Sequence, residues 1–172
     1  MTEQRSDDQR TPGQRTDAQP AEDIRGVLIQ VTGARLLMPN AAIAEVLSYA
    51  DPEPVEGAPD WLLGRVRWRG WQLPLVAFSR LTGIAEEQPG LGNKMIVLKA
   101  FGGQGRLPFF AVLTQGFPRL VTVSQSGLVG VEPGEPLPAG VLGLVRLNDD
   151  PALLPDVVRL EAMIDEAMAE AA

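Results

Sequence analysis

The stretch from residue 59 to residue 78 most constrains what this chain can fold into, because it has the pattern of a β-hairpin. Val66 and Trp68 alternate with charged residues. The charged residues are Arg65, Arg67 and Arg69. Successive side chains of a strand point to opposite faces, so this spacing predicts a strand with one apolar and one basic face. Arg69-Gly70 is the predicted turn, since glycine adopts positive φ angles without steric cost.

A second copy of this pattern begins 79 residues later in the chain. Five residues recur in order: Pro59, Leu63, Gly64, Val66 and Arg67 match Pro138, Leu142, Gly143, Val145 and Arg146. Further on, the Arg69-Gly70 turn matches Asn148-Asp149, and Leu73-Pro74 matches Leu154-Pro155 with two extra residues between. This agreement of apolar, turn and proline positions indicates a duplicated β unit. We therefore expect two similar lobes.

The composition argues against several classes of protein. The 172 residues carry a net charge of −7, whereas a general nucleic-acid binder needs a basic face to displace counterions. No run approaches the roughly 18 consecutive apolar residues of a membrane span, so we expect no direct membrane insertion. The chain has no cysteine and hence no disulfide, which favours a cytoplasmic location.

Residue types that commonly carry catalysis are scarce. The chain has no histidine, which removes the usual general base, the commonest metal ligand and His-based triads. Its carboxylates are scattered over predicted loops, and the Asp149-Asp150 pair is expected to be solvated rather than to bind a cation. The glycine-rich 102–105 segment is followed by no GK[ST] sequence, so a hairpin turn explains it better than a phosphate site. We expect no enzyme, metal or cofactor, although catalysis by carboxylates stays open.

The rest of the chain alternates short apolar runs with Gly/Pro-rich loops and ends in one helix. Residues 1–23 contain no Leu, Ile, Val or aromatic residue and are predicted to be a disordered tail. Residues 86–93 are a polar linker between the two copies of the repeat. Asp156 is the predicted N-cap of the helix, whose apolar face carries Val157, Leu160, Ile164 and Met168. Residues 166–172 are its end or a frayed tail.

The arginine face of the first hairpin has two interpretations. A row of arginines on a strand is often simply a solvated outer face. Arg and Trp are also enriched at the energetic centres of protein interfaces, and these arginines lie next to Trp68 and Trp71. The second interpretation is therefore a surface that orients a protein partner.

The same residues resemble the CheW-like coupling domains, which are adaptors of bacterial chemosensory arrays. The family motif is Pro, an apolar pair, Gly-Val-x-Asn-Leu-Arg-Gly and then an apolar run through Pro. Here it stands as Pro59, Leu62-Leu63, Gly64 to Gly70, and Leu73 to Phe78, with Arg69-Gly70 matching the motif's Arg-Gly. The resemblance extends over residues 24–164 and includes an apolar-acid-apolar element at Ala44-Glu45-Val46.

The resemblance implies a mainly β fold of two small SH3-like five-stranded β-barrel subdomains packed together, with a C-terminal α-helix. The CheW-like domain would span residues 24–165. Arg67-Trp68 stands where the motif has Asn-Leu, which makes the chain more similar to the divergent ChpC-like adaptors of type IV pilus chemosensory systems.

The resemblance also implies a function, that of a non-catalytic adaptor in pilus-mediated twitching motility. Its partners would be the cytoplasmic tip of a chemoreceptor, the regulatory domain of a CheA-type histidine kinase and other CheW-like domains. The protein would then be cytoplasmic and recruited to membrane-associated receptor arrays. The expected protein-binding residues are Glu45, Val46, Gly64, Arg65, Arg67, Arg69 and Trp71. The alternative is a β-barrel protein that binds a small ligand between its lobes.

Overall fold

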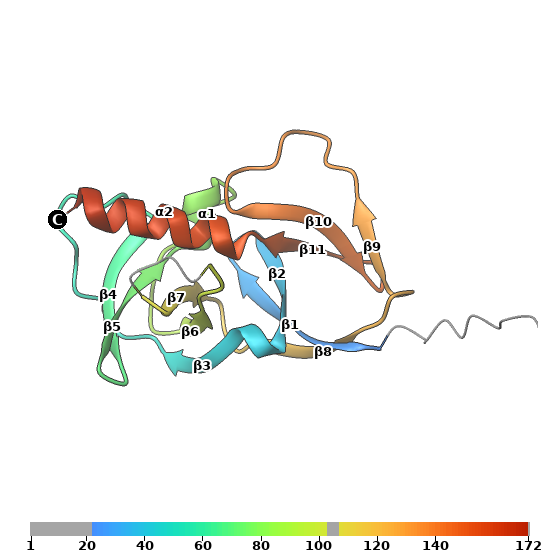
Figure 1. Cartoon of the computed structure of the whole chain (residues 1–172), viewed down its shortest axis with the longest axis horizontal. Helices are drawn as coiled ribbons and strands as arrows, with labels where there is room; N and C mark the ends of the chain where they lie inside the picture. Colours follow the sequence, from blue (N-terminus) through green and yellow to red (C-terminus); the bar gives the residue numbers. More distant parts are fainter. Residues whose placement is uncertain (1–21, 103–106, 172) are drawn as a thin grey trace, which may run out of the picture.

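The computed structural model describes residues 22–102 and 107–171. Almost all of the expected disordered tail, residues 1–23, and most of the glycine-rich 102–105 turn lie outside the described residues. Within the described part the chain forms eleven β-strands, one short 3-10 turn and two α-helices (Figure 1). The strands make two sheets, so the mainly β fold class expected from the sequence is confirmed.

One sheet has five strands from the middle of the chain, in the order β3-β6-β7-β5-β4. They are β3 (Ile43–Ser48), β4 (Leu62–Trp68), β5 (Trp71–Val76), β6 (Lys94–Lys99) and β7 (Phe109–Thr114). The other sheet has six strands from the two ends of the chain, in the order β8-β1-β2-β11-β10-β9. They are β1 (Ile24–Val31), β2 (Ala34–Pro39), β8 (Arg119–Val123), β9 (Leu128–Val131), β10 (Val141–Leu147) and β11 (Asp150–Pro155). The remaining elements are η1 (Asn40–Ala42), α1 (Phe78–Thr82) and α2 (Val157–Glu170).

Each sheet contains one copy of the hairpin that repeats in the sequence. The antiparallel register shifts between Leu62 and Gly64 in β4–β5, and between Val141 and Gly143 in β10–β11. Each shift is a β-bulge, and the two bulges fall at matching positions of the repeat. The second strand of each hairpin then pairs in parallel with another hairpin, β5 with β7 and β11 with β2. The predicted duplication is therefore confirmed.

One detail of the predicted alignment is wrong. Leu75 lies beside Gly64 in the register, and Leu154 lies beside Gly143. The two copies therefore align without the expected two-residue insertion, and Pro155 occupies the place of Val76 rather than that of Pro74. Proline has no N–H for a β-ladder and occurs only where none is needed, so its position can differ between two otherwise equivalent strands.

Residues 86–93 do not separate the two sheets, contrary to the expectation that they divide the two copies into lobes. They connect α1, which follows β5, to β6, and both of these strands belong to the five-stranded sheet. The sheets are instead divided because the N-terminal hairpin β1–β2 pairs with strands from the C-terminal end of the chain. The parallel contact of Leu36 with Leu153 and the antiparallel contact of β1 with β8 make this connection.

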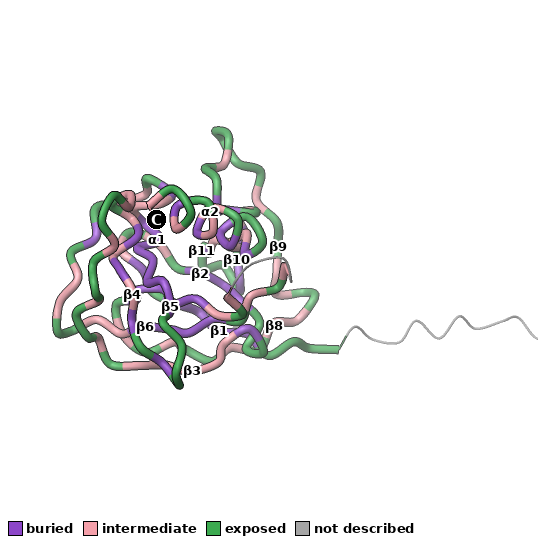
Figure 2. The backbone as a smooth tube through the Cα atoms, turned by 60° about the vertical axis from the view of Figure 1, so that its left-hand side comes forward, coloured by how far each residue is buried: buried purple, intermediate pink, exposed green. Residues whose placement is uncertain are grey.

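Buried apolar side chains form three clusters, one inside each sheet and one between them. One cluster packs on the inner face of the five-stranded sheet and includes Val66, Trp68 and Leu73. Leu28, Leu37, Val145, Leu147 and Ala152 fill the six-stranded sheet. The largest cluster joins residues of both sheets to α2. Figure 2 shows the buried segments running through the middle of the molecule, with turns and loops exposed around them.

Helix α2 covers the junction of the two sheets and runs from β11 toward β4 and β5 (Figure 1). Asp156 caps its first turn. The Asp156 Oδ1 accepts a hydrogen bond from the backbone N–H of Arg159, with the N and O atoms 3.1 Å apart. Its buried face carries Leu160 and Ile164, as expected from their spacing. Among residues 22–102 and 107–171, no helix is long and apolar enough to cross a membrane.

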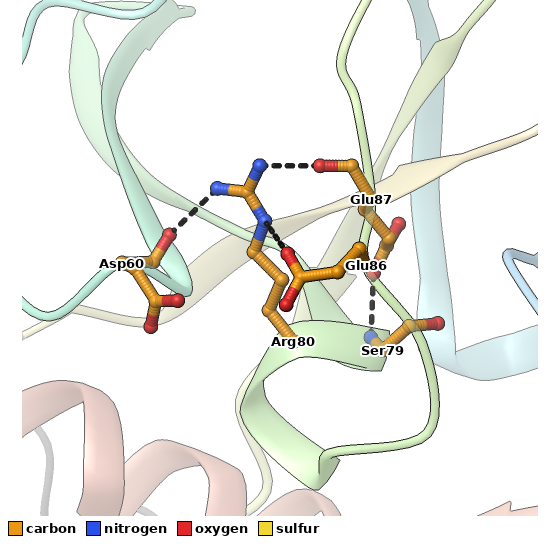
Figure 3. A network of polar contacts seen from close by, with 5 residues as sticks. All are labelled: Asp60, Ser79, Arg80, Glu86 and Glu87. Carbon is orange, nitrogen blue, oxygen red and sulfur yellow. Dashed lines mark hydrogen bonds and ion pairs between the residues drawn. The ribbon is translucent and has the colours of Figure 1, made fainter.

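The start of the 86–93 segment, at Glu86 and Glu87, is held in place by a polar network around Arg80 (Figure 3). The Arg80 guanidinium donates to the backbone oxygens of Asp60, at 3.1 Å, and of Glu87, and its Nε lies 3.9 Å from a Glu86 carboxylate oxygen. The Glu87 side chain accepts from the Ser79 N–H at the start of α1. Glu87 is only 2% exposed, so a residue expected in a polar linker is part of the packed interior.

Burial raises the pKa of Glu87 above its ordinary value of 4.5, although hydrogen bonds from Ser79 and the charge of Arg80 oppose the shift. A raised carboxyl pKa means that the folded state holds the proton more tightly than the unfolded state. This contribution to the free energy of unfolding is therefore fully present below pH 4.5, and it is lost as the pH rises through the folded-state pKa of Glu87. Glu87→Gln keeps an acceptor oxygen for Ser79 without the charge. We expect wild type to lose stability relative to Glu87→Gln as pH rises above 4.5, measured by urea unfolding. A relative gain by wild type would contradict the direction of the shift.

Candidate protein-binding surface at the β4–β5 hairpin

The tip of the β4–β5 hairpin is a tight two-residue turn. Arg69 and Gly70 have φ angles of 47° and 80°, and Trp68 pairs with Trp71 on either side of them. Two left-handed residues in succession match the right-handed twist of the flanking strands. The turn predicted from sequence is therefore confirmed, and the repeat has the same conformation at Asn148 and Asp149, with φ angles of 48° and 72°.

The two faces of β4 divide as the period-two pattern predicts. Val66 and Trp68 are 6% and 8% exposed and belong to the interior of the five-stranded sheet. The Trp68 ring meets Phe109 of β7 edge to face, with the ring centroids 4.8 Å apart. Arg67 is exposed and Arg65 is half-buried on the opposite face.

Glu45 of β3 connects two residues at the hairpin tip. Its carboxylate accepts a hydrogen bond from the Trp68 indole N–H and lies 3.4 Å from the Arg69 Nε. The Arg69 guanidinium also lies 5.1 Å from the centroid of the Trp68 ring, within cation–π range. The side chains of Arg69 and Glu45 remain 70% and 38% exposed. Two residues expected in the binding surface are thus brought together, although 24 positions separate them in sequence.

Gly64 and Val46 are also expected in the surface, but both have structural roles beneath it. Gly64 is buried at the β4 bulge with a φ of +145°, and a Cβ there would lie 2.3 Å from the Glu53 carbonyl oxygen. Beside it, Glu53 and Arg65 exchange two backbone hydrogen bonds of 2.8 Å. Val46 is half-buried and packs against the cluster between the sheets. Both residues shape the scaffold beneath the exposed side chains.

The exposed part of the tip is formed by Arg67, Arg69, Gly70 and Trp71. Trp71 is 41% exposed and approaches Phe109 with a centroid distance of 6.5 Å. A hollow of about 470 Å³ lies against the tip and is lined by residues 67–72. Arg65 instead lines a second hollow, of about 330 Å³, between β4–β5 and α2. The surface therefore combines positive charge, one half-exposed indole and a tight two-residue turn.

The chain matches the model of the CheW-like domain over residues 25–164. It belongs to the CheW-like domain family. Among solved structures it is similar to the crystal structure of the scaffolding protein TtCheW from Thermoanaerobacter tengcongensis, with a TM-score of 0.66 and 12% sequence identity. That match covers 81% of this chain and 88% of the other. No curated protein sequence matches significantly. The expected architecture of two SH3-like β subdomains with a C-terminal helix fits the CheW-like fold.

Sequence reasoning missed Phe109 as part of this CheW-like surface. Its ring supports both Trp68 and Trp71 from the neighbouring part of the sheet. The parallel pairing of β5 with β7 brings this residue beside the hairpin. An aromatic residue at the start of a strand otherwise gives no signal of this contact.

Two observations bear on the expected alternatives to a protein-binding role. A hollow of about 590 Å³ is lined by β1, β2, β9, β10, β11 and the β1–β2 turn, so it lies on the six-stranded sheet and not between the sheets. The described part of the chain contains no group of three or more His, Cys, Asp or Glu residues that could hold a metal ion.

Proposed function

We propose that this CheW-like domain is a non-catalytic adaptor that couples chemoreceptors to a CheA-type histidine kinase in a bacterial chemosensory array. Membership of the CheW-like family supports an adaptor role. The observation that carries the proposal is the hairpin tip, where Glu45 and Trp68 hold Arg69 in an exposed, rigid turn. A scaffold of this kind requires preorganised surfaces rather than reactive groups, which agrees with a sequence that has no histidine and no cysteine.

The proposed partners are the cytoplasmic tip of a chemoreceptor, the regulatory domain of the kinase and other CheW-like domains. The departure of Arg67-Trp68 from the family motif supports a place in the ChpC-like branch and hence in twitching motility. Within that branch the more basic tip would select the partner. Association at membrane-bound receptors would follow from these protein contacts.

The proposed contact residues are the exposed ones, Arg67, Arg69 and Trp71, with Arg65 at the margin. Arginine and tryptophan supply a large share of binding energy at interfaces when their surroundings fix their geometry. Glu45 acts as a positioning residue, because its carboxylate limits the directions that the Arg69 guanidinium can take. Gly64 and Val46 contribute by shaping β3 and β4 beneath the surface.

The test is the charge reversal Arg69→Glu, measured in binding titrations with array receptors and kinase from the same organism at fixed salt. We expect affinity to fall more than tenfold, because a partner carboxylate loses its guanidinium and meets a like charge. The stability cost is expected to be no more than about 1 kcal/mol, since the Arg69–Glu45 ion pair is exposed.

Asn148→Glu is the matched control. Asn148 occupies the same position of the equivalent turn in the other sheet and is also exposed. It is expected to leave binding unchanged. Arg67→Glu tests the same face without disturbing Glu45. If both Arg69→Glu and Arg67→Glu bind every array partner as wild type does, the proposed site is wrong.

A further inference from the structure

The six-stranded sheet has one strand more than the five-stranded sheet, namely β9 at the edge of β10. The equivalent edge of the five-stranded sheet lacks such a strand. In the six-stranded sheet, β9 pairs with the outer edge of β10 from Leu144 to Leu147. The Asn148 N–H of the following turn donates to the Gly127 carbonyl, at 2.8 Å. Hydrogen bonding alternates along an antiparallel strand, so Arg146 exchanges its outward bonds with Val129. In the five-stranded sheet, β4 takes the place of β10 and is the edge strand.

Only the beginning of the β4 edge is covered in the same way. Arg65, the counterpart of Leu144, exchanges two 2.8 Å backbone hydrogen bonds with Glu53. Pro52 and Pro54 flank Glu53 and have no N–H with which to extend the ladder. By the same alternation, the N–H and C=O of Arg67 point away from β5. Within residues 22–102 and 107–171, no other backbone segment pairs with Arg67 or with the Arg69 N–H.

The surroundings of this open edge specify the chemistry of what it can bind. Arg67, Arg69 and Gly70 are exposed, and the hollow of about 470 Å³ lies beside them. In the part of the chain that the structure describes, Glu45 pairs with Arg69 but no carboxylate pairs with Arg67. An acidic segment would satisfy this charge. A second copy of the chain would not, because antiparallel pairing of two β4 edges sets arginine against arginine.

We propose that the outer edge of β4 binds an extended acidic segment of a protein partner as an additional antiparallel strand, in the place that β9 has on β10. Such strand addition gains affinity from backbone hydrogen bonds and specificity from alternate side chains. The partner residue opposite Arg67 is acidic. The residue opposite Trp68 is apolar, as Leu128 is opposite Leu147. The inference rests on one part of the proposed function, namely that the arginine face of the hairpin is a protein-binding surface.

The protein itself supplies the probe for the experiment. A peptide of residues 126–131 carrying Val129→Glu reproduces β9 with an acid at the position that would face Arg67. Amide chemical shifts of the full chain are followed by nuclear magnetic resonance during the titration. We expect saturable shifts at Arg67 and Arg69. A peptide methylated on the backbone nitrogen of residue 129, or carrying Val129→Lys, is expected to bind at least tenfold more weakly.

A pair of variants at Arg67 separates strand addition from simple charge attraction. Arg67→Gln removes the charge and keeps the outward N–H, whereas Arg67→Pro removes both at an edge that tolerates proline, so we expect the fold to persist in both and the peptide to bind Arg67→Pro at least tenfold more weakly than Arg67→Gln. Arg146→Pro is the matched control, because its N–H is already paired with β9, and it is expected to lower the melting temperature. Equal binding of the methylated and unmethylated peptides would overturn the proposal, and so would the absence of saturable shifts.

The outcome is separable from that of the proposed function. If array partners bind in an Arg69-dependent way and the peptide does not bind, the strand site is wrong and the adaptor role stands. If the peptide binds and no array partner does, the edge is a strand-binding site and the adaptor role is wrong.

Discussion

Trp68→Ala is expected to lower the free energy of unfolding by about 3–5 kcal/mol, as other large-to-small changes in protein cores do. The ring is 8% exposed and packs edge to face on Phe109. Removing it leaves a cavity in the five-stranded sheet and takes away the indole donor that Glu45 accepts. It also removes the ring on which the Arg69 guanidinium lies. The measurement is urea unfolding followed by circular dichroism.

Trp71→Ala is the control for this prediction. Trp71 is the cross-strand partner of Trp68 in the same hairpin, but it is 41% exposed. Its loss is expected to cost about 1 kcal/mol or less, since little buried area disappears. Equal effects of the two substitutions would mean that the deeper burial of Trp68 is not the source of its contribution to stability. A near-neutral Trp68→Ala would place that ring on the binding surface instead.

The features that could be predicted from the sequence depend on neighbouring residues. The alternation of Val66 and Trp68 with arginines fixes the faces of β4, because side chains of a strand alternate whatever lies around them. The turn at Arg69-Gly70 and the Asp156 cap are equally local. The repeat at Asn148-Asp149 could be found because both copies keep the same turn.

The features that could not be predicted depend on contacts between distant segments. The pairing of Leu36 with Leu153 joins the two ends of the chain in one sheet, and no local pattern specifies it. The burial of Glu87 follows from the packing of α1, whereas its polar neighbours in sequence indicate a solvated linker. Such contacts are decided by the whole apolar surface that the fold can bury.

The candidate surface combines both kinds of information. Arg69 and Glu45 were each expected in it through their resemblance to the family motif, but nothing in the sequence pairs one with the other. The curvature of the five-stranded sheet brings β3 to the hairpin tip, so that one carboxylate meets both Trp68 and Arg69. The same hairpin therefore uses its inner face for stability and its outer face and edge for binding.

This division explains why a residue in the family motif need not touch a partner. Gly64 lies within the motif, yet it is buried where the Glu53 backbone pairs with β4 as an antiparallel bridge. Its side of the strand has no room for a side chain, whereas Arg67 and Arg69 extend from exposed positions. Loss of partner binding on substitution of Gly64 would then report a distorted scaffold rather than a lost contact.

Gly64→Ala is therefore expected to destabilise the fold by about 3–5 kcal/mol. A left-handed φ of +145° costs an alanine about 1–3 kcal/mol, and relieving a 2.3 Å approach to the Glu53 oxygen disrupts two backbone hydrogen bonds of about 1 kcal/mol each. Gly143→Ala is the matched control, because this equivalent glycine has no positive φ and its Cβ would meet only Leu154 at 4.0 Å. It is expected to change stability by less than about 1 kcal/mol. Urea unfolding of both variants decides the matter, since equal stabilities would mean that the close contact of Glu53 with β4 is not what requires glycine at this bulge.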